Sequence, residues 1–173
     1  MHNAKNKKGY SLVEMIIYVS ILALLFLTVV DMMLTIGTSY SSLKATKLLN
    51  TSAGIAMERL SRETKNALSI NDANSVFGAF LGELSLERAE PGGGMTPVRF
   101  YLENEQLKLS ESGMLEGSLT GSATKVKKFL LTKVTLQKSV GVKIELTLES
   151  QFKDKIASST FYTTVIVRGS YQN

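Results

Sequence analysis

The feature that most constrains this sequence is a long apolar run near its N-terminus. Residues 10–30 read YSLVEMIIYVSILALLFLTVV and contain a single charged side chain, Glu14. A helix over this run would be about 30 Å long, which is the hydrocarbon thickness of a bilayer. A domain of this size seldom buries a helix that is apolar on every face. The run therefore predicts a membrane span rather than a core helix.

The residues before the run are basic. Lys5, Lys7 and Lys8 carry three positive charges, and no acid lies among residues 1–9. By the positive-inside rule, this flank keeps the N-terminus cytoplasmic and sends everything after Asp31 across the membrane. A cleaved secretory signal is the alternative, but its apolar region usually covers about 7 to 15 residues. The nearest small-x-small cleavage site, at residues 39–41, lies well beyond the run.

The composition removes most catalytic mechanisms. The chain has no cysteine, and its one histidine is His2. Disulfides, thiolate nucleophiles and cysteine-based metal sites are excluded, and a Ser-His-Asp triad cannot form in a folded region. The net charge of +5 owes three charges to the first nine residues, and the other basic residues form no stripe that could follow phosphates. We expect neither an enzyme nor a nucleic-acid-binding protein.

Glu14 is the anomaly of the apolar run. A carboxylate within a bilayer-spanning segment costs on the order of 3 kcal/mol unless a partner or protonation offsets it. In an uncleaved anchor, Glu14 could lie at the membrane interface and reach water, because Lys7 and Lys8 are only one to two helical turns away. Otherwise Glu14 needs a partner.

Residues 7–14 read KKGYSLVE, and the apolar stretch follows directly. This pattern resembles the prepilin-type N-terminal signal of type IV pilin-like proteins, which include minor pilins and type II secretion pseudopilins. Its parts are a short basic leader, a glycine before the cut, an aromatic or hydrophobic first mature residue, and a glutamate at the fifth mature position. Here Tyr10 stands where phenylalanine is usual, and residues 10–90 lack the proline that many major pilins carry in the apolar helix.

The resemblance implies a processing pathway. Gly9 would be the last leader residue recognised by a prepilin peptidase, and Tyr10 would be the new N-terminus, whose amine the same enzyme methylates. In the family, the fifth-position glutamate, here Glu14, pairs with the N-terminal ammonium of a neighbouring subunit and sets the register of a filament. Since residues 10 and 14 share one helix face, a pair within one subunit is the rival interpretation.

The helix is expected to continue to about residue 67. Apolar and small residues recur at i, i+3, i+4 and i+7 spacing on one face, and two i,i+4 ion pairs are predicted on the polar face, Glu58 with Arg62 and Arg59 with Glu63. The predicted face comprises Leu49, Ala53, Ala56, Met57, Leu60, Thr64 and Ala67.

The remainder predicts a β-rich head. Residues 70–96 and 110–124 read as irregular connectors, residues 98–109 as a short hairpin, and residues 129–137, 142–152 and 158–167 as strands with alternating apolar side chains. We expect an α+β fold in which the long helix packs on three to five antiparallel strands. The predicted divisions are a leader (1–9), a transmembrane or filament-core helix (10–33), an amphipathic helix (34–67) and a globular head (68–173).

Two features of the head bear on its function. The last strand, ending in Arg168, resembles that of minor pilins and J-type pseudopilins, although an ordinary edge strand with a solvated arginine explains it as well. Calcium sites occur in some pseudopilin heads, but the oxygen-bearing residues here match no EF-hand spacing, so no cofactor or metal is expected. Those residues are Asn71, Asp72, Asn74, Glu83, Glu87 and Glu90.

Two hypotheses for function follow. The first is a minor pilin or pseudopilin that is processed at Gly9 and assembles through its N-terminal helix with other pilins and an inner-membrane assembly platform. It would reside in the inner membrane with the head extracytoplasmic, and enter a surface or periplasmic filament. The second is an uncleaved, single-pass anchor for an extracytoplasmic binding module.

Overall fold

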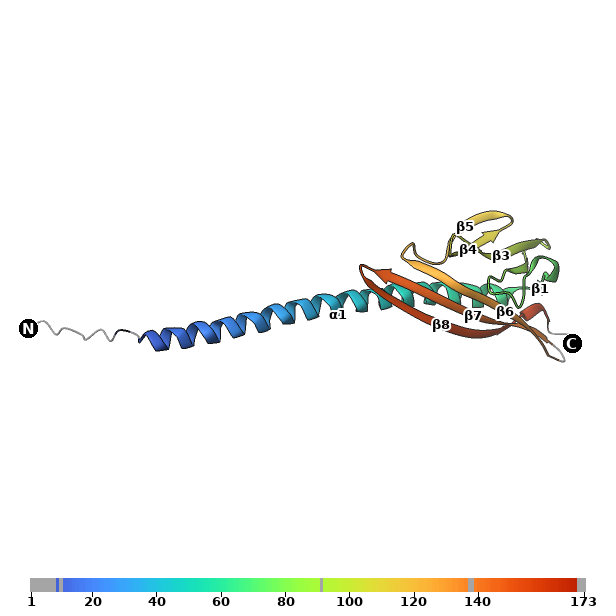
Figure 1. Cartoon of the computed structure of the whole chain (residues 1–173). Helices are drawn as coiled ribbons and strands as arrows, with labels where there is room; N and C mark the ends of the chain where they lie inside the picture. Colours follow the sequence, from blue (N-terminus) through green and yellow to red (C-terminus); the bar gives the residue numbers. More distant parts are fainter. Residues whose placement is uncertain (1–8, 10, 91, 137–138, 171–173) are drawn as a thin grey trace, which may run out of the picture. The chain divides into compact units, whose positions relative to one another are not determined.

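The computed structural model describes residues 9, 11–90, 92–136 and 139–170. It divides the chain into two compact units, residues 1–40 and 41–173 (Figure 1). One helix, α1 (Leu12–Asn66), contributes to both units, so each part of it is described with its own unit. The helix ends one residue from the predicted boundary, and its continuity fits the absence of proline.

The N-terminal part of α1 is exposed around its whole circumference. Every residue from 11 to 40 is exposed except Glu14, which is half-buried. Its serine and threonine hydroxyls donate to carbonyls one turn earlier, as in Ser20 to Ile16 at 2.8 Å and Thr35 to Asp31 at 3.0 Å. These bonds satisfy polar side chains inside an apolar helix without any partner outside it.

The second part of α1 buries one face in the head. Ala45, Ala56 and Leu60 are fully buried, and Leu49 and Ala53 nearly so. The predicted face is confirmed, with Met57 partly buried against the core. Most of these side chains are small, which lets the sheets approach the helix backbone closely.

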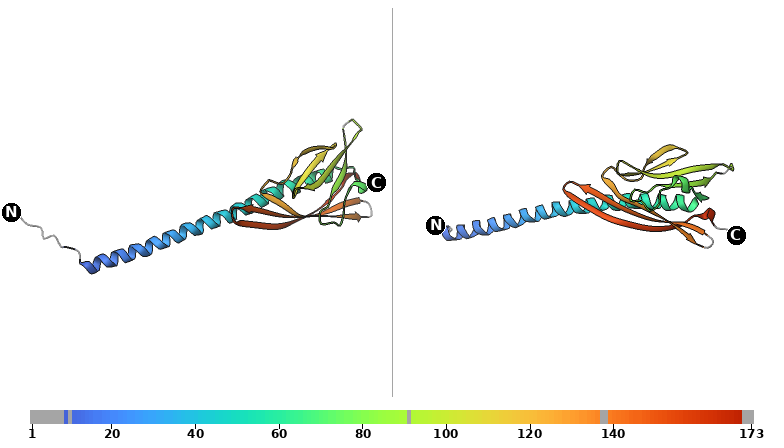
Figure 2. Two further views of the ribbon diagram at one scale, coloured as in Figure 1. Left: turned by 45° about the horizontal axis from the view of Figure 1, so that its top comes forward. Right: turned by 45° about the vertical axis from the view of Figure 1, so that its right-hand side comes forward.

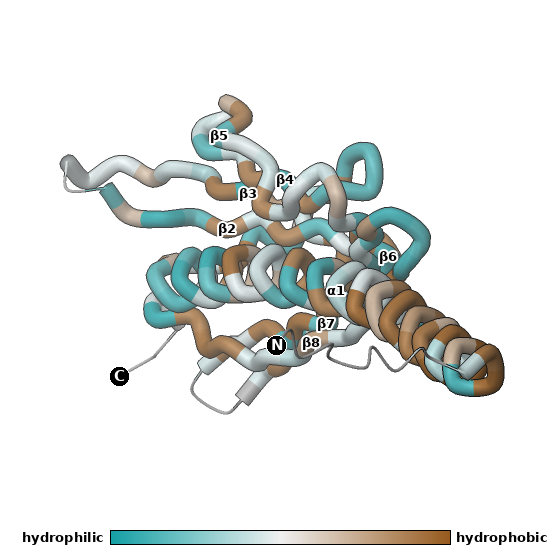
Figure 3. Tube along the Cα trace, turned by 90° about the vertical axis from the view of Figure 1, so that its left-hand side faces the viewer, coloured by the Kyte–Doolittle hydropathy of each residue, from teal (hydrophilic) through white to brown (hydrophobic). Residues whose placement is uncertain are grey.

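The head contains two antiparallel sheets. The first has the order β1-β2-β3-β4-β5 and the second β6-β7-β8. Strands of the first sheet lie on one side of α1, and β7 and β8 lie on the other (Figures 2 and 3). The strands are β1 (Ser69–Ile70), β2 (Leu84–Ala89), β3 (Met95–Glu103), β4 (Gln106–Glu111), β5 (Met114–Ser118), β6 (Thr124–Leu136), β7 (Ser139–Phe152) and β8 (Lys155–Ile166).

Alternating side chains from both sheets meet α1 in one hydrophobic core. Phe100 of β3 and Phe129 of β6 are its largest fully buried side chains. On β7, Val142, Ile144 and Leu146 are all fully buried, whereas the residues between them are half-buried or exposed. The alternation of apolar and polar residues, from which strands were predicted in the last third of the chain, therefore reflects one buried and one outer face of the sheet.

The predicted hairpin is confirmed as β3 and β4. Its two turn residues, Asn104 and Glu105, have φ values of 54° and 58°. Both lie in the left-handed region, as a two-residue type I′ turn requires, and asparagine tolerates that region better than most residues. The Glu105 carbonyl accepts from Val126 N–H at 2.7 Å, which ties this turn to β6.

The predictions of irregular connectors at 70–96 and 110–124, and of three to five strands, were wrong. The described chain has eight strands, because these segments contain β2 and β5 and parts of β1, β3 and β4. β2 escaped detection because Leu84, Ser85 and Leu86 are all buried, so its sequence does not alternate. Residues 71–75 bond along the edge of β2: Asn71 N–H donates to Ser85 O at 2.9 Å, and the Ser75 hydroxyl accepts from Ser85 N–H at 3.0 Å.

The prediction that both i,i+4 ion pairs lie on the polar face was half wrong. Glu58 and Arg62 pair at 3.5 Å and are exposed. Glu63, in contrast, retains only 6% exposure and lies between Arg59, at 3.2 Å, and Arg88 of β2, at 3.1 Å. Arg88 also pairs with Glu111 of β4. The buried carboxylate therefore links α1 to the first sheet.

We predict that Glu63→Gln lowers the free energy of unfolding by about 1–3 kcal/mol, because it leaves two partly buried guanidinium groups without their shared carboxylate. Glu58→Gln is the matched control and should change it by less than about 0.5 kcal/mol, because that pair is solvated. Urea denaturation of the two variants measures the difference. Equal effects of the two substitutions would show that the buried ion pairs of Glu63 contribute no more to the free energy of unfolding than the exposed pair does.

The segment before β2 lies against the outer edge of β6. Gly82 N–H donates to Phe129 O at 2.7 Å, and Phe129 N–H donates to Phe80 O at 2.9 Å. A Cβ atom at Gly82 would lie 2.7 Å from the Phe129 carbonyl oxygen and 3.1 Å from that of Val76. The absence of a side chain at Gly82 is therefore what allows this approach.

We predict that Gly82→Ala destabilises the head by about 1–3 kcal/mol, because the methyl group overlaps backbone atoms that cannot move freely. Gly54→Ala, on the exposed face of α1 with nothing within 4 Å, should instead stabilise it by about 0.5–1 kcal/mol. Thermal unfolding monitored by circular dichroism shows whether each variant has a lower or a higher melting temperature than the wild type. A neutral Gly82→Ala variant would contradict the proposed close packing.

Candidate functional site

The sequence-predicted site lies at the start of α1. Gly9 is exposed and precedes the helix, whereas Lys5, Lys7, Lys8 and Tyr10 lie outside the described residues. α1 begins at Leu12, so Glu14 occupies its first turn. An acidic side chain there interacts favourably with the positive end of the helix dipole.

The Glu14 carboxylate has a partner that sequence reasoning missed. The Tyr18 hydroxyl donates to Glu14 Oε1 at 3.2 Å, from the next turn of the same helix. The i,i+4 spacing of Tyr18 after Glu14 was a signal that could have revealed it. The bond engages one carboxylate oxygen, and no described ion pair involves Glu14.

The helix surface around Glu14 is apolar. Leu12, Ile16 and Phe26 are 75%, 58% and 67% exposed. Within the described residues, α1 is the one helix long and apolar enough to span a membrane, and none of its most apolar window is buried. Such a continuous apolar surface needs lipid or other helices around it.

Asp31 is the next charged side chain after Glu14. It is exposed, and among the described residues no hydrogen bond or ion pair engages its carboxylate, whose backbone carbonyl alone receives the Thr35 hydroxyl. Glu14 and Asp31 are about 25 Å apart along the helix axis. The uncharged segment between them therefore approaches the hydrocarbon thickness of a bilayer.

The oxygen-bearing residues considered for calcium are each engaged by protein groups. Asp72 pairs with Lys133 at 2.5 Å, Glu87 accepts from the Ser69 hydroxyl at 2.9 Å, and Glu90 accepts from the Thr96 hydroxyl. Within the described residues, no group of three acidic or histidine side chains could hold a metal ion. Of the six residues, the structure joins Asn71 to Asn74 and Glu87: the Asn71 side chain accepts from Asn74 N–H at 3.2 Å and donates to Glu87 Oε1 at 3.3 Å.

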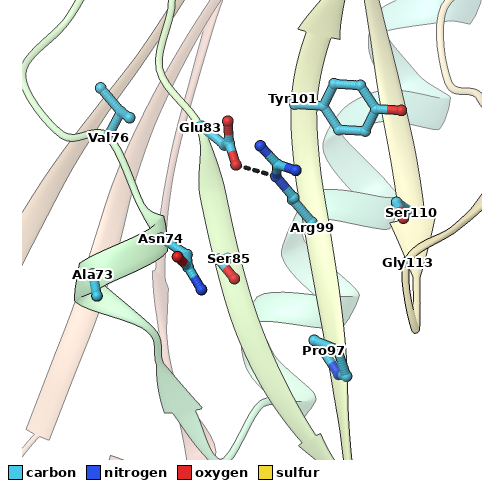
Figure 4. A pocket seen from close by; sticks show the side chains of 10 residues that line it. All are labelled: Ala73, Asn74, Val76, Glu83, Ser85, Pro97, Arg99, Tyr101, Ser110 and Gly113. Carbon is cyan, nitrogen blue, oxygen red and sulfur yellow. Dashed lines mark hydrogen bonds and ion pairs between the residues drawn. The ribbon is translucent and has the colours of Figure 1, made fainter.

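The first sheet carries a groove of about 530 Å³ on its outer face, between the 3-10 helix η1 (Asp72–Asn74) and the turn before β5 (Figure 4). Ser85, Arg99 and Ser110 lie in one row across β2, β3 and β4. Arg99 pairs with Glu83 and lies 5.4 Å from the centre of the Tyr101 ring. The hydrogen bond to Glu83 raises the pKa of Arg99, so the guanidinium stays charged.

We predict a favourable coupling of about 0.5–1 kcal/mol between Glu14 and Tyr18, because the hydroxyl lowers the cost of placing the carboxylate in an apolar medium. A double-mutant cycle with Glu14→Leu and Tyr18→Phe, read as the free energy of membrane insertion, measures it. The matched cycle with Tyr40→Phe should give no coupling. Additive effects in the Tyr18 cycle would contradict the contact.

Comparison with protein families gives a match at the N-terminus. Residues 4–30 match the family described as the prokaryotic N-terminal methylation motif. This range contains Gly9, Tyr10 and Glu14, together with the apolar helix as far as Val30. No curated protein and no solved structure matches the chain.

Proposed function

We propose that this chain, which is type IV pilin-like by its N-terminal motif, is a structural subunit of a type IV pilus-like or type II secretion filament. The observation that carries the proposal is an apolar helix exposed on all sides that holds one carboxylate in its first turn. A lipid anchor requires only the apolar surface. Assembly with similar helices also explains the carboxylate, because it can pair with a cation of a neighbouring subunit.

Processing would begin at the Gly9–Tyr10 peptide bond. A prepilin peptidase hydrolyses this bond and methylates the new amine of Tyr10, and the leader with Lys5, Lys7 and Lys8 leaves. Removing the three lysines takes away the charges that hold the N-terminus at the cytoplasmic surface. One ammonium at Tyr10 replaces them, and methylation preserves its charge.

Glu14 would then set the register between subunits. In an apolar surrounding, the ammonium of a neighbouring Tyr10 offsets the cost of the Glu14 carboxylate, and the pair forms at one axial offset only. The Tyr18 hydroxyl supports this arrangement, because it engages a single carboxylate oxygen at 3.2 Å. The other oxygen remains available to an ammonium.

The chain fits a single-pass inner-membrane protein. We place its N-terminus in the cytoplasm and its head outside, with the filament at the surface or in the periplasm. A minor pilin or pseudopilin is favoured over a major pilin, because the head is small and the chain has no cysteine for the disulfide of many major pilins. Its partners would be other pilins, the peptidase and the assembly platform.

We predict that Gly9→Val leaves a full-length precursor in the membrane, whereas the wild-type chain starts at Tyr10 with one added methyl group. Glu14→Leu should be processed and inserted but enter filaments about 100-fold less, the equivalent of about 3 kcal/mol of lost pairing. Intact-mass analysis of membrane and filament fractions measures both.

Ala4→Val in the leader and Val13→Leu in the helix are the matched controls, and both should process and assemble normally. Normal incorporation of Glu14→Leu would remove the register role of Glu14. A native chain that still begins at Met1 would instead favour an uncleaved anchor for an extracytoplasmic module.

A further inference from the structure

The last strand, β8, forms an edge of the second sheet and pairs only with β7. Val167, just after the strand, donates its N–H to Val140 O at 2.9 Å. Because pairing in an antiparallel ladder alternates, the odd-numbered residues of β8 bond to β7. The N–H and C=O groups of the even-numbered residues therefore point away from the sheet. These residues are Ile156, Ser158, Thr160, Tyr162, Thr164 and Ile166.

This edge lacks the features that normally protect an edge strand. Residues 156–166 read IASSTFYTTVI, with no charge, no glycine and no proline. Natural proteins block long edges with lysines, prolines or bulges, because unpaired backbone groups otherwise recruit another strand. Ile156 and Tyr162 are 62% and 63% exposed on the outer row. The edge is therefore long, regular and uncharged.

The other sheet edges of the described chain are protected. The outer edge of β6 is bonded by residues 78–82 and by Glu105, and β6 carries Lys125, Lys127, Lys128 and Lys133. β5 is short, contains the positive-φ residue Gly117, and joins β4 through a register shift. β1 has two residues. Protection at these edges contrasts with its absence at β8.

The side chains of the outer row indicate what can pair there. Apolar side chains stand at both ends and at Tyr162, and small hydroxyl side chains stand between them. The Thr160 hydroxyl bonds to that of Thr147 on β7 at 2.9 Å, so it is already satisfied within the sheet. A charged strand would find no counter-charge along residues 156–166. An uncharged strand with alternate apolar residues matches the row.

A second copy of this chain is the less suitable partner. Ser52 of α1 bonds to Thr124, which bonds to Ser150 near the start of β8, and Gly169 after β8 bonds to Ala67 after α1. β8 therefore runs in the same direction as the second part of α1 (Figure 1). Antiparallel pairing of two β8 strands would direct the second parts of the two α1 helices oppositely, so copies whose heads point in one direction cannot pair in this way.

We propose that β8 accepts an extended, uncharged strand of a different protein chain, which extends the β6-β7-β8 sheet. Only an extended backbone presents donors and acceptors at the spacing of the free groups of β8. This inference goes beyond the proposed function, because it concerns a strand of the head and does not require leader processing or filament assembly; the choice of a different chain over a second copy rests on the proposed anchoring of all copies in one direction.

The test uses the full-length chain in detergent micelles and a synthetic capped peptide that copies residues 156–166 as the probe strand. In the chain alone, the amides of the even-numbered residues from 158 to 166 should exchange with solvent rapidly, and the odd-numbered ones slowly. Saturating peptide should slow exchange at the even-numbered amides by about tenfold or more. Even-numbered amides that are already protected without peptide would overturn the proposal.

Ser158→Pro removes one outward N–H and leaves the bonds of β8 to β7 intact. Proline is tolerated at such a position of an edge strand, because the missing N–H is one that faces solvent. It should weaken peptide binding about tenfold at an unchanged melting temperature, whereas Ser158→Ala should bind normally. Thr160→Lys, a second variant that keeps every backbone bond, should also weaken binding.

Unchanged binding in both Ser158→Pro and Thr160→Lys would show that the edge is not the binding surface. Sedimentation of the chain without peptide tests the choice of partner. A dimer that Ser158→Pro abolishes would overturn the choice of a different chain and assign the edge to a second copy.

Discussion

The N-terminal part of α1 is governed by the cost of holding a carboxylate in an apolar helix. Between Ser11 and Tyr40 no side chain is buried, and Glu14 is the one charged group before Asp31. Water would penalise the apolar surface, and hydrocarbon would penalise the carboxylate. The Tyr18 hydroxyl reduces the second penalty but leaves the charge unneutralised. Both costs are lowered where other helices surround this one and supply a cation, which is the environment that the proposed pilin-like assembly would provide.

The head follows a different logic, in which small residues on α1 let two sheets share one helix. Alanines and serines at the buried face bring β-strands from both sides close to the helix backbone, and Leu49 and Leu60 fill the core between them. Glu63 then fixes the first sheet to the helix through Arg88. The Glu105 turn closes the hairpin against β6, where Lys125 and Lys127 hold the pKa of the Glu105 carboxyl below its usual range.

The sequence predicted the elements whose two faces differ in environment. The buried face of α1, the β3-β4 hairpin and the three long strands of the second sheet all show clear periodicity. β2 does not, because residues 71–75 bond to the backbone of Ser85 at the strand edge and Ser85 is buried like its neighbours. The burial of Glu63 depends on Arg88, which is distant in sequence and could not be inferred from helical spacing. At the site, the pattern around Gly9, Tyr10 and Glu14 was recognisable from local sequence, and the Tyr18 contact, although missed, is also signalled by its i,i+4 spacing from Glu14.

The hydroxyl groups along α1 affect how readily the helix can be transferred from lipid to a protein surrounding. Ser20, Thr28 and Thr35 each donate to a carbonyl of their own helix, so none depends on a neighbour for its hydrogen bond. A helix that satisfies its own polar groups can pass from a lipid surrounding to a protein surrounding without breaking a bond on the way. Under the proposed function, extraction from the bilayer would exchange one apolar contact for another, and pairing of Glu14 with a neighbouring ammonium would fix the axial position of the helix.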